Sequence, residues 1–141
     1  MSFITRHRIA ATVTASGGAS QAYYTSAVVN GYLVGIVVSK PLTSGVSTGA
    51  NILITDADSS QVLLNVTSTN ATNSIVSYYP RALTQTNAGA LLGAATGAGA
   101  VVGIPDRLAI AEERIKVQFT SAGTASAGGL RATLDFYIEG R

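Results

Sequence analysis

The chain contains no cysteine and no tryptophan, and His7 is its only histidine. The absence of cysteine excludes a disulfide scaffold and leaves the redox compartment undetermined. The seven acidic residues are scattered along the 141-residue chain. No acid near His7 in the sequence would orient its ring, so no catalytic triad is indicated. We therefore expect no enzymatic activity, no cofactor and no bound metal.

Charge is also scarce, because only 11% of the residues are charged, against roughly 25% in typical globular domains. A surface built mainly of Ser, Thr, Asn, Gly and Ala follows. Such a surface has few charges to keep molecules apart, and it suits a protein packed against copies of itself or a partner. We expect a homo-oligomer, either a dimer or a trimer.

The charges are unevenly distributed along the chain. The net charge of +2 is too small to indicate nucleic-acid binding. Residues 1–55 carry Arg6, Arg8 and Lys40 but no acid. Two interpretations stay open, a chance outcome in a charge-poor chain or a basic N-terminal arm, residues 1–8, that meets an acidic neighbour. On the second interpretation the candidate interface residues are Phe3, Arg6, His7 and Arg8.

Targeting and membrane segments are not indicated. The N-terminus lacks the apolar stretch of roughly 7–15 residues that a secretory signal requires, so synthesis in the cytoplasm is expected. The charge-free window 82–105 is dominated by Gly, Ala, Thr and Asn. It falls short of the roughly 20 mainly apolar residues of a membrane span.

Alternating apolar and polar residues predict strands along most of the chain. Residues 27–39 are apolar on both faces and rich in β-branched side chains, which is typical of a central strand. Asp and Ser residues at 56–60 predict a hairpin turn between strands 51–55 and 61–67, and turn capping is preferred there over a calcium loop. Further strands are predicted at residues 9–15, 74–79, 115–119 and 130–138.

Two regions are harder to assign. Residues 105–114 fit a short turn that feeds the strand at 115–119. Residues 84–103 are too poor in large side chains to pack a core, which predicts a long projecting Gly/Ala-rich loop. The final strand is expected to pair with the strand before it. We predict one all-β domain over residues 1–141, an antiparallel β-sandwich or jelly roll of about seven or eight strands.

Exposed apolar side chains supply the remaining interface candidates. Adjacent tyrosines, Tyr23–Tyr24 and Tyr78–Tyr79, place one ring in a core and the other outside. Tyr24 and Tyr79 are therefore candidate interface anchors, although incidental exposure is the alternative. In the predicted loop, Leu91, Leu92, Val101 and Val102 are expected to contact a neighbour.

Four features of the sequence occur together: a charge-poor β chain rich in Gly, Ala, Ser and Thr, an early Ala-rich strand, the segment PDRLAIAEERIKV at 105–117 and the ending LDFYIEGR at 134–141. In these features the chain resembles small virion proteins of tailed bacteriophages. Among those proteins, the chain is most similar to capsid decoration, or cement, proteins.

The resemblance implies a β-sandwich oligomer on the capsid surface of a virion, where it clamps neighbouring subunits of the major capsid protein. It brings no catalytic residues. Two alternatives remain: another virion part, such as a tail-tube, head–tail joining or fibre subunit, or a carbohydrate-binding β-sandwich.

Overall fold

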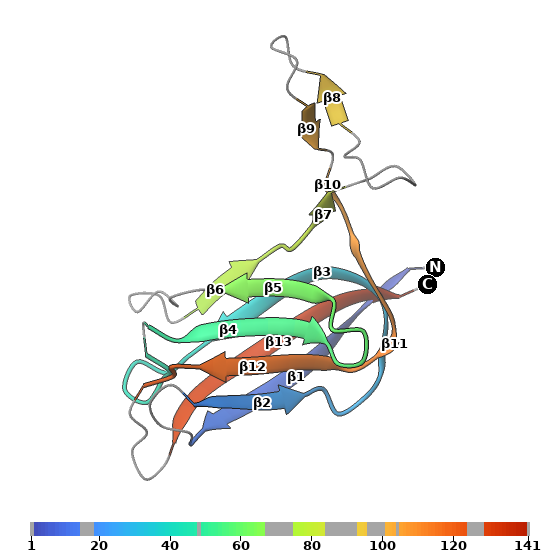
Figure 1. The fold of residues 1–141 in the computed structure, drawn as a ribbon. Coiled ribbons are helices and arrows are strands. Elements are labelled where there is room, and N and C mark those ends of the chain that lie inside the picture. Colours follow the sequence, from blue (N-terminus) through green and yellow to red (C-terminus); the bar gives the residue numbers. More distant parts are fainter. Residues whose placement is uncertain are drawn as a thin grey trace.

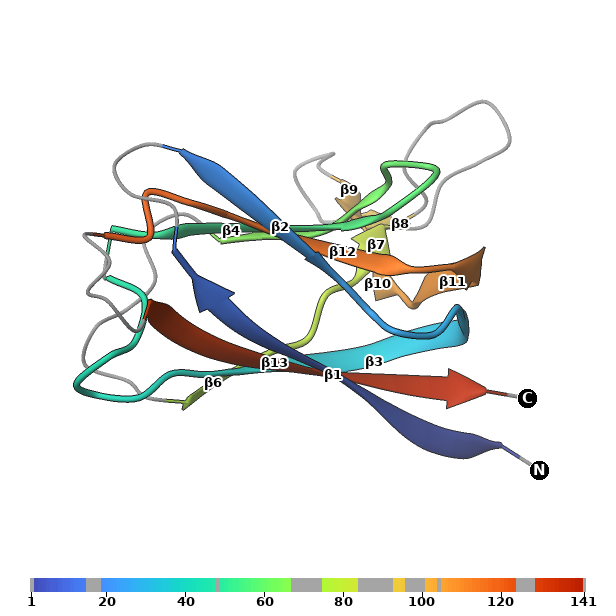
Figure 2. The ribbon, with the colours of Figure 1, turned by 90° about the horizontal axis from the view of Figure 1, so that it is seen from below.

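The computed structural model describes residues 2–14, 19–47, 49–66, 75–83, 93–95, 101–103, 105–123 and 129–140. Within these ranges there is no helix, and thus none long and apolar enough to cross a membrane. The strands form two antiparallel sheets packed face to face (Figures 1 and 2). The predicted all-β sandwich is confirmed.

The first sheet has five strands in the order β1-β13-β3-β11, with β6 also paired to β3. They are β1 (Phe3–Val13), β13 (Leu130–Gly140), β3 (Val29–Ser39), β11 (Leu108–Glu113) and β6 (Ile75–Tyr78). β1 and β13 pair along eleven residues, from Phe3 opposite Gly140 to Val13 opposite Leu130. β3 pairs with three strands, which confirms its predicted central position.

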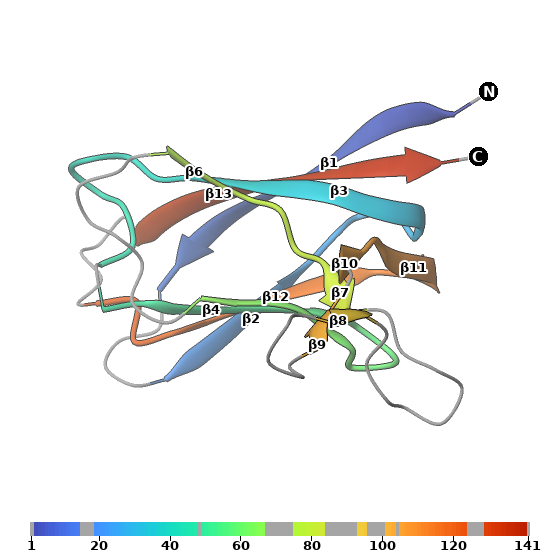
Figure 3. The ribbon, with the colours of Figure 1, turned by 90° about the horizontal axis from the view of Figure 1, so that it is seen from above.

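The second sheet has four strands in the order β2-β12-β4-β5. They are β2 (Ser20–Tyr24), β12 (Ile115–Thr120), β4 (Asn51–Asp56) and β5 (Val62–Val66). The predicted β4–β5 hairpin is confirmed, and the Ser60 amide donates to the Asp56 carbonyl at 3.1 Å in its turn. Figure 3 shows the two layers edge-on, with β4, β5 and β12 in one layer and β3 and β13 in the other.

The core lies between the sheets, where the inward side chains of both are almost fully buried. The largest are Leu33, Ile36, Ile52, Ile54, Ile110, Ile115, Phe119, Leu134, Phe136 and Ile138. Each such side chain contributes about 1.5–3 kcal/mol by burial. Tyr23 meets Phe119 edge-to-face, with ring centroids 5.9 Å apart.

Two short strand pairs extend from the sandwich. β7 (Ala82–Leu83) pairs with β10 (Pro105–Asp106), and β8 (Gly93–Ala95) pairs with β9 (Val101–Gly103). Figure 1 shows β8 and β9 beyond β7 and β10, away from the two large sheets. The segment 84–103, predicted to be a loop, thus contains a short hairpin; the rest of that segment lies outside the described residues.

Three predictions of local structure were wrong. Residues 108–113 form strand β11 rather than a turn, because Leu108 and Ile110 face the core and the chain changes sheets only at Arg114. Glu112, with φ 55°, makes this corner without glycine or proline. The final strand β13 pairs with β1 and β3, whereas β12 lies in the other sheet.

The third difference concerns the N-terminus. Strand β1 begins at Phe3, so residues 3–8 belong to the sheet instead of forming an arm ahead of it. The inward positions Thr5 and His7 are only half-buried, unlike Ile9, Ala11 and Val13. Because these two inward residues are polar, the apolar alternation that reveals the strand starts later in the sequence.

Candidate interaction surface

The outer faces of the two sheets differ in composition. On the four-stranded sheet, most outward residues are polar: Asn51, Thr55, Asn65, Lys116, Gln118 and Thr120, with Leu53, Tyr24 and the exposed Val62 as apolar members. The five-stranded sheet instead presents a surface that we name the tyrosine face. Its apolar and aromatic members are Ile4, Tyr32, Val37, Ile75, Tyr79 and Tyr137. Of these, Ile4, Ile75 and Tyr79 are more than 60% exposed.

A shallow groove crosses the tyrosine face at Gly35. Strand register places Tyr137 beside Gly35, and Arg6 beside Tyr137 on its other side. A methyl group added at Gly35 would come within 3.3 Å of the Tyr79 ring, so that ring lies directly over the glycine. The groove has a volume of about 250 Å³, and its lining includes Val37 and Ser77. The absence of a side chain at residue 35 therefore creates this groove.

An ion pair joins β1 to β13 next to the groove. Arg8 donates from Nε to Asp135 Oδ1 at 2.7 Å and from a terminal nitrogen to Oδ2 at 2.9 Å. These hydrogen bonds, with smaller help from the charges of Arg8 and Arg6, lower the pKa of Asp135, although burial acts in the opposite direction. Asp135 is 7% exposed, while the Arg8 side chain remains half exposed. The pair fixes the Arg8 guanidinium on the tyrosine face.

The backbone of β1 has one unpaired edge. In a strand, the N–H and C=O groups of one residue point to the same side, and successive residues point to opposite sides. The Thr12 carbonyl accepts a hydrogen bond from the Tyr23 hydroxyl of the other sheet, so Thr12 points away from β13. Consistently, Arg131 opposite Thr12 uses its own N–H and C=O on residues 44–46. The even-numbered residues of β1 therefore face the free edge.

This free edge is closed at one end and open at the other. Beyond Thr12, the Thr14 amide donates to Gln21 Oε1 at 2.9 Å. In the described part of the chain, no hydrogen bond reaches the backbone groups that Ile4, Arg6, Arg8 and Ala10 direct outward. All four of these residues are exposed. Figure 2 shows the N-terminal half of β1 turning away from the second sheet.

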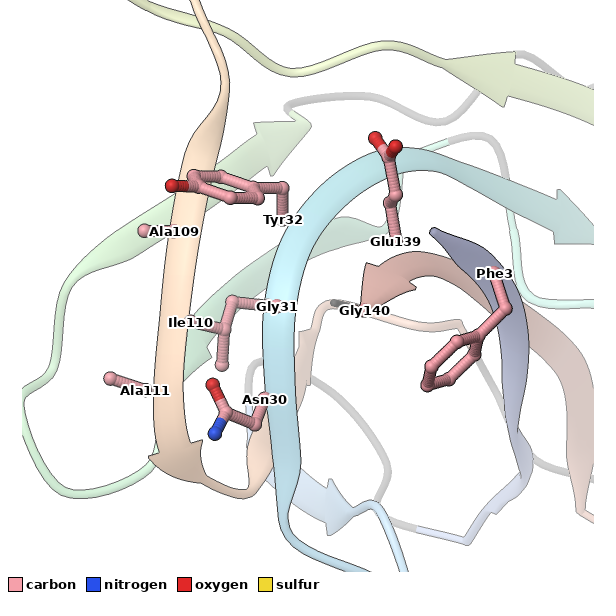
Figure 4. Close-up of a pocket in the computed structure, with 9 residues that line it drawn as sticks. All are labelled: Phe3, Asn30, Gly31, Tyr32, Ala109, Ile110, Ala111, Glu139 and Gly140. Atoms are coloured by element: carbon pink, nitrogen blue, oxygen red, sulfur yellow. The ribbon is translucent and has the colours of Figure 1, made fainter. Parts of the chain in front are cut away.

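A larger cavity, of about 490 Å³, lies near the ends of β1 and β13 (Figure 4). Gly31 has φ +142°, and a methyl group there would collide with the Glu139 carbonyl. The Phe3 ring packs against Gly140, where an added methyl would come within 2.9 Å of it. These close approaches let β3 and β1 fold tightly over the end of β13. Arg107 forms an ion pair with Glu139, a lining residue of the cavity.

Asp56 is a buried acid at the far end of β4. It is 3% exposed and faces inward, and its Oδ1 has no hydrogen-bond partner among the described residues. Burial, and secondly the negative charge of Glu113, raise the pKa of Asp56, while the Ser59 hydroxyl lowers it. Glu113 itself accepts from the amides of Asp58 and Ser59. Glu113 thus joins the β4–β5 turn to the corner between β11 and β12.

The structure places most of the predicted interface residues. Phe3, Arg6 and Arg8 are exposed on β1, and His7 is half-buried on its inward side. Tyr24 and Tyr79 are exposed while Tyr23 and Tyr78 pack against the core, as predicted for the tyrosine pairs. Tyr79, Arg6 and Arg8 share the tyrosine face, but Tyr24 lies on the opposite sheet.

The remaining predicted residues are those of the Gly/Ala-rich segment. Leu91 and Leu92 lie outside the described residues, and Val101 and Val102 lie in β9, of which only the backbone is described. Their contacts stay a prediction.

The sequence interpretation missed three residues of this surface: Gly35, Asp135 and Tyr137. Asp135 lies on the outer face of β13, where the ion pair with Arg8 covers it. Asp135 occupies one of the alternate polar positions of β13, and so does Glu139, so no local pattern distinguishes Asp135. Among the described residues, no three His, Cys, Asp or Glu side chains come together as a metal site would require.

Comparison with known proteins finds no matching protein family and no similar curated protein.

Proposed function

We propose that this protein is a structural virion protein that binds the outer surface of a phage capsid and cements neighbouring major capsid subunits. The observation that carries the proposal is the contrast between the two outer faces of the sandwich. The outer face of the five-stranded sheet presents tyrosines, exposed isoleucines and arginines. On the four-stranded sheet most outward residues are small or uncharged polar ones, and the exceptions are Tyr24, Leu53, Val62 and Lys116. Tyr and Arg are enriched in protein interfaces, and exposed apolar patches commonly mark them.

On this proposal, the tyrosine face meets the shell and the polar face meets solvent. A protein that binds the assembled shell and not its dissociated subunits stabilises the shell by mass action. Repetition over many sites makes modest contacts sufficient. Self-association into a dimer or trimer stays part of the proposal, and light scattering of the purified protein measures it directly.

Two exposed tyrosines on opposite sheets offer a matched test. Tyr79 is 69% exposed on the tyrosine face, and Tyr24 is 49% exposed on the polar face. We expect Tyr79→Ser to weaken co-sedimentation with stripped particles of the encoding phage, and Tyr24→Ser to leave it unchanged. Equal binding by both variants would contradict the assignment of the face.

Copy number tests the function itself. Quantitative mass spectrometry of purified particles should find hundreds of copies per particle, and particles that lack the protein should release their genome at lower temperature. A few copies per particle would indicate a joining ring or fibre instead. Absence from the particles would refute a virion role.

The groove at Gly35 favours carbohydrate binding as a second candidate function. Tyr79 and Tyr137 offer aromatic surface beside the Ser77 hydroxyl, in a space of about 250 Å³. Aromatic rings with a few polar groups form a typical small-ligand site. A glycan array with Tyr79→Ser and Tyr24→Ser as the variant pair separates this candidate from capsid binding.

A further inference from the structure

We propose that the open half of β1, residues Ile4 to Ala10, binds an extended acidic segment of a partner protein, which adds to the five-stranded sheet as a further strand. The proposal rests on the proposed function in taking the partner to be a protein. It goes further in naming the edge that is used and the chemistry of the segment.

The first argument is the row of free backbone groups. Ile4, Arg6, Arg8 and Ala10 direct their N–H and C=O groups away from β13, and in the described ranges nothing bonds to them. An exposed strand edge of this kind is a template for another strand. The Tyr23 and Gln21 contacts near Thr12 close the same edge toward its other end, so the template has a defined length.

The second argument is charge. The side chains that flank the open edge include Arg6 and Arg8, and residues 1–55 contain no acid. Two acids of β13 lie opposite β1. Asp135 is held by Arg8 through two hydrogen bonds, and Glu139, opposite Ile4, forms an ion pair with Arg107. Arg6 forms no ion pair within the described residues. An added strand with acids at alternate positions would place them beside these arginines.

The same charges disfavour a second copy of β1 as the occupant. Antiparallel pairing of two β1 edges must set even-numbered residues opposite one another. The three registers that overlap most of the open half place Arg6 opposite Arg6, Arg6 opposite Arg8, or Arg8 opposite Arg8. Like charges directly opposite each other destabilise a sheet. Arginines on an edge also protect it from pairing with itself.

The test titrates the isolated 141-residue protein with a labelled peptide, Thr-Glu-Val-Glu-Val-Glu-Thr with blocked termini, and follows fluorescence anisotropy. The peptide in which Gln replaces every Glu is the charge control. We expect the Glu peptide to bind and the Gln peptide to bind at least several-fold more weakly. Added salt should reduce this difference in affinity, because it screens the attraction between Glu and Arg. Hydrogen exchange should show new protection of the Arg6 and Arg8 amides when the Glu peptide is bound.

Two variants locate the site. Ala10→Pro removes one outward N–H without breaking the β13 ladder, and Ala10→Val keeps that N–H at the same position. We expect Ala10→Pro to weaken peptide binding about threefold to tenfold, as for loss of one hydrogen bond, and Ala10→Val to bind as the parent does. Arg6→Gln should weaken binding of the Glu peptide alone and leave folding intact.

Several outcomes would overturn the proposal. They are no binding of the Glu peptide at millimolar concentration, equal binding of the Glu and Gln peptides, or no new protection of the β1 amides. A dimer in the absence of peptide that Ala10→Pro dissociates would identify a second copy as the occupant. If the protein binds phage particles but not the Glu peptide, this proposal is refuted and the proposed function stands. If the protein binds the Glu peptide but not phage particles, the proposed function is refuted and this proposal stands.

Discussion

Asp56 offers the sharpest test of how burial governs the stability of this sandwich. Its carboxylate faces the interior at the end of β4, opposite Ile115, with one oxygen unpartnered in the described structure. A buried polar atom without a hydrogen bond costs about 1–3 kcal/mol. The weak Ser59 contact, at 3.4 Å, and the nearby turn reduce the cost. Asp56→Asn keeps a polar group at this position but removes the buried negative charge and its repulsion with Glu113. We therefore expect Asp56→Asn to stabilise the protein at pH 7 by about 1–2 kcal/mol, since an unpaired buried charge costs more than an unpaired neutral group.

The effect should depend on pH in a defined direction. The folded-state pKa of Asp56 is raised above the unfolded value of 3.8. The protonated carboxyl is therefore favoured by the fold, and its contribution to stability is full below pH 3.8 and is lost as pH rises through the folded pKa. The advantage of Asp56→Asn should thus be greatest at neutral pH and should shrink on acidification.

Urea unfolding of both proteins between pH 3 and pH 8 would measure this difference, and other carboxylates cancel in the comparison. In thermal scans, the variant should melt about 3–5 °C higher per kcal/mol at pH 7. Glu113→Gln should give a smaller gain in the same direction, since it removes the neighbouring charge and keeps an acceptor for the turn amides. A variant Asp56→Asn that is less stable at pH 7 would show that the charged carboxylate is stabilising, contrary to this reasoning.

Three other substitutions test separate parts of the structure. Arg8→Gln should lower the free energy of unfolding at pH 7, because it removes the ion pair with Asp135. The loss should shrink as pH falls through the lowered pKa of Asp135, since the ion pair stabilises the fold only while this carboxylate is charged. Urea titrations at several pH values would measure this change. Gly31→Ala should cost at least about 3 kcal/mol, because its φ is positive and a β13 carbonyl occupies the space; Gly49→Ala, which meets nothing within 4 Å, is the matched control and should be neutral or slightly stabilising by circular dichroism. Tyr23→Phe should cost about 1 kcal/mol through loss of its hydrogen bond to β1 and retain the edge-to-face contact, as thermal melts would report.

Local sequence patterns predicted correctly those strands and turns whose residues show which side is buried. β3 is rich in apolar and β-branched residues and pairs with strands on both of its edges. The Asp/Ser cluster at 56–60 marks a turn through its own hydrogen-bonding groups. The corner at Glu112 has no such marker, because a non-glycine residue adopts the positive φ. The sheet that a strand joins is likewise invisible, since β12 and β13 show the same alternation in different sheets.

Some features of the tyrosine face could likewise be predicted from the sequence, and others could not. The basic charge of Arg6 and Arg8 depends on residues close together in the sequence, and so does the exposure of Tyr79 beside Tyr78. Both features can therefore be predicted from the sequence. The Arg8–Asp135 pair joins positions 127 residues apart, and the groove at Gly35 is lined by Tyr79, which follows β6 and is distant from Gly35 in the sequence. Such juxtapositions depend on strand register, which one sequence does not encode in any local pattern.

The pairing of β1 with β13 has a consequence for how the chain folds. The first strand of the sheet forms its ladder with the last, and β3 also needs β13 to complete its own pairing. During synthesis from the N-terminus, both edges of β1 therefore stay open until the final eleven-residue strand has emerged. Contacts between such distant residues slow folding, because a long loop must close before they form. Arg6 and Arg8 lie on this strand, and like charges placed directly opposite each other disfavour the pairing of two β1 strands.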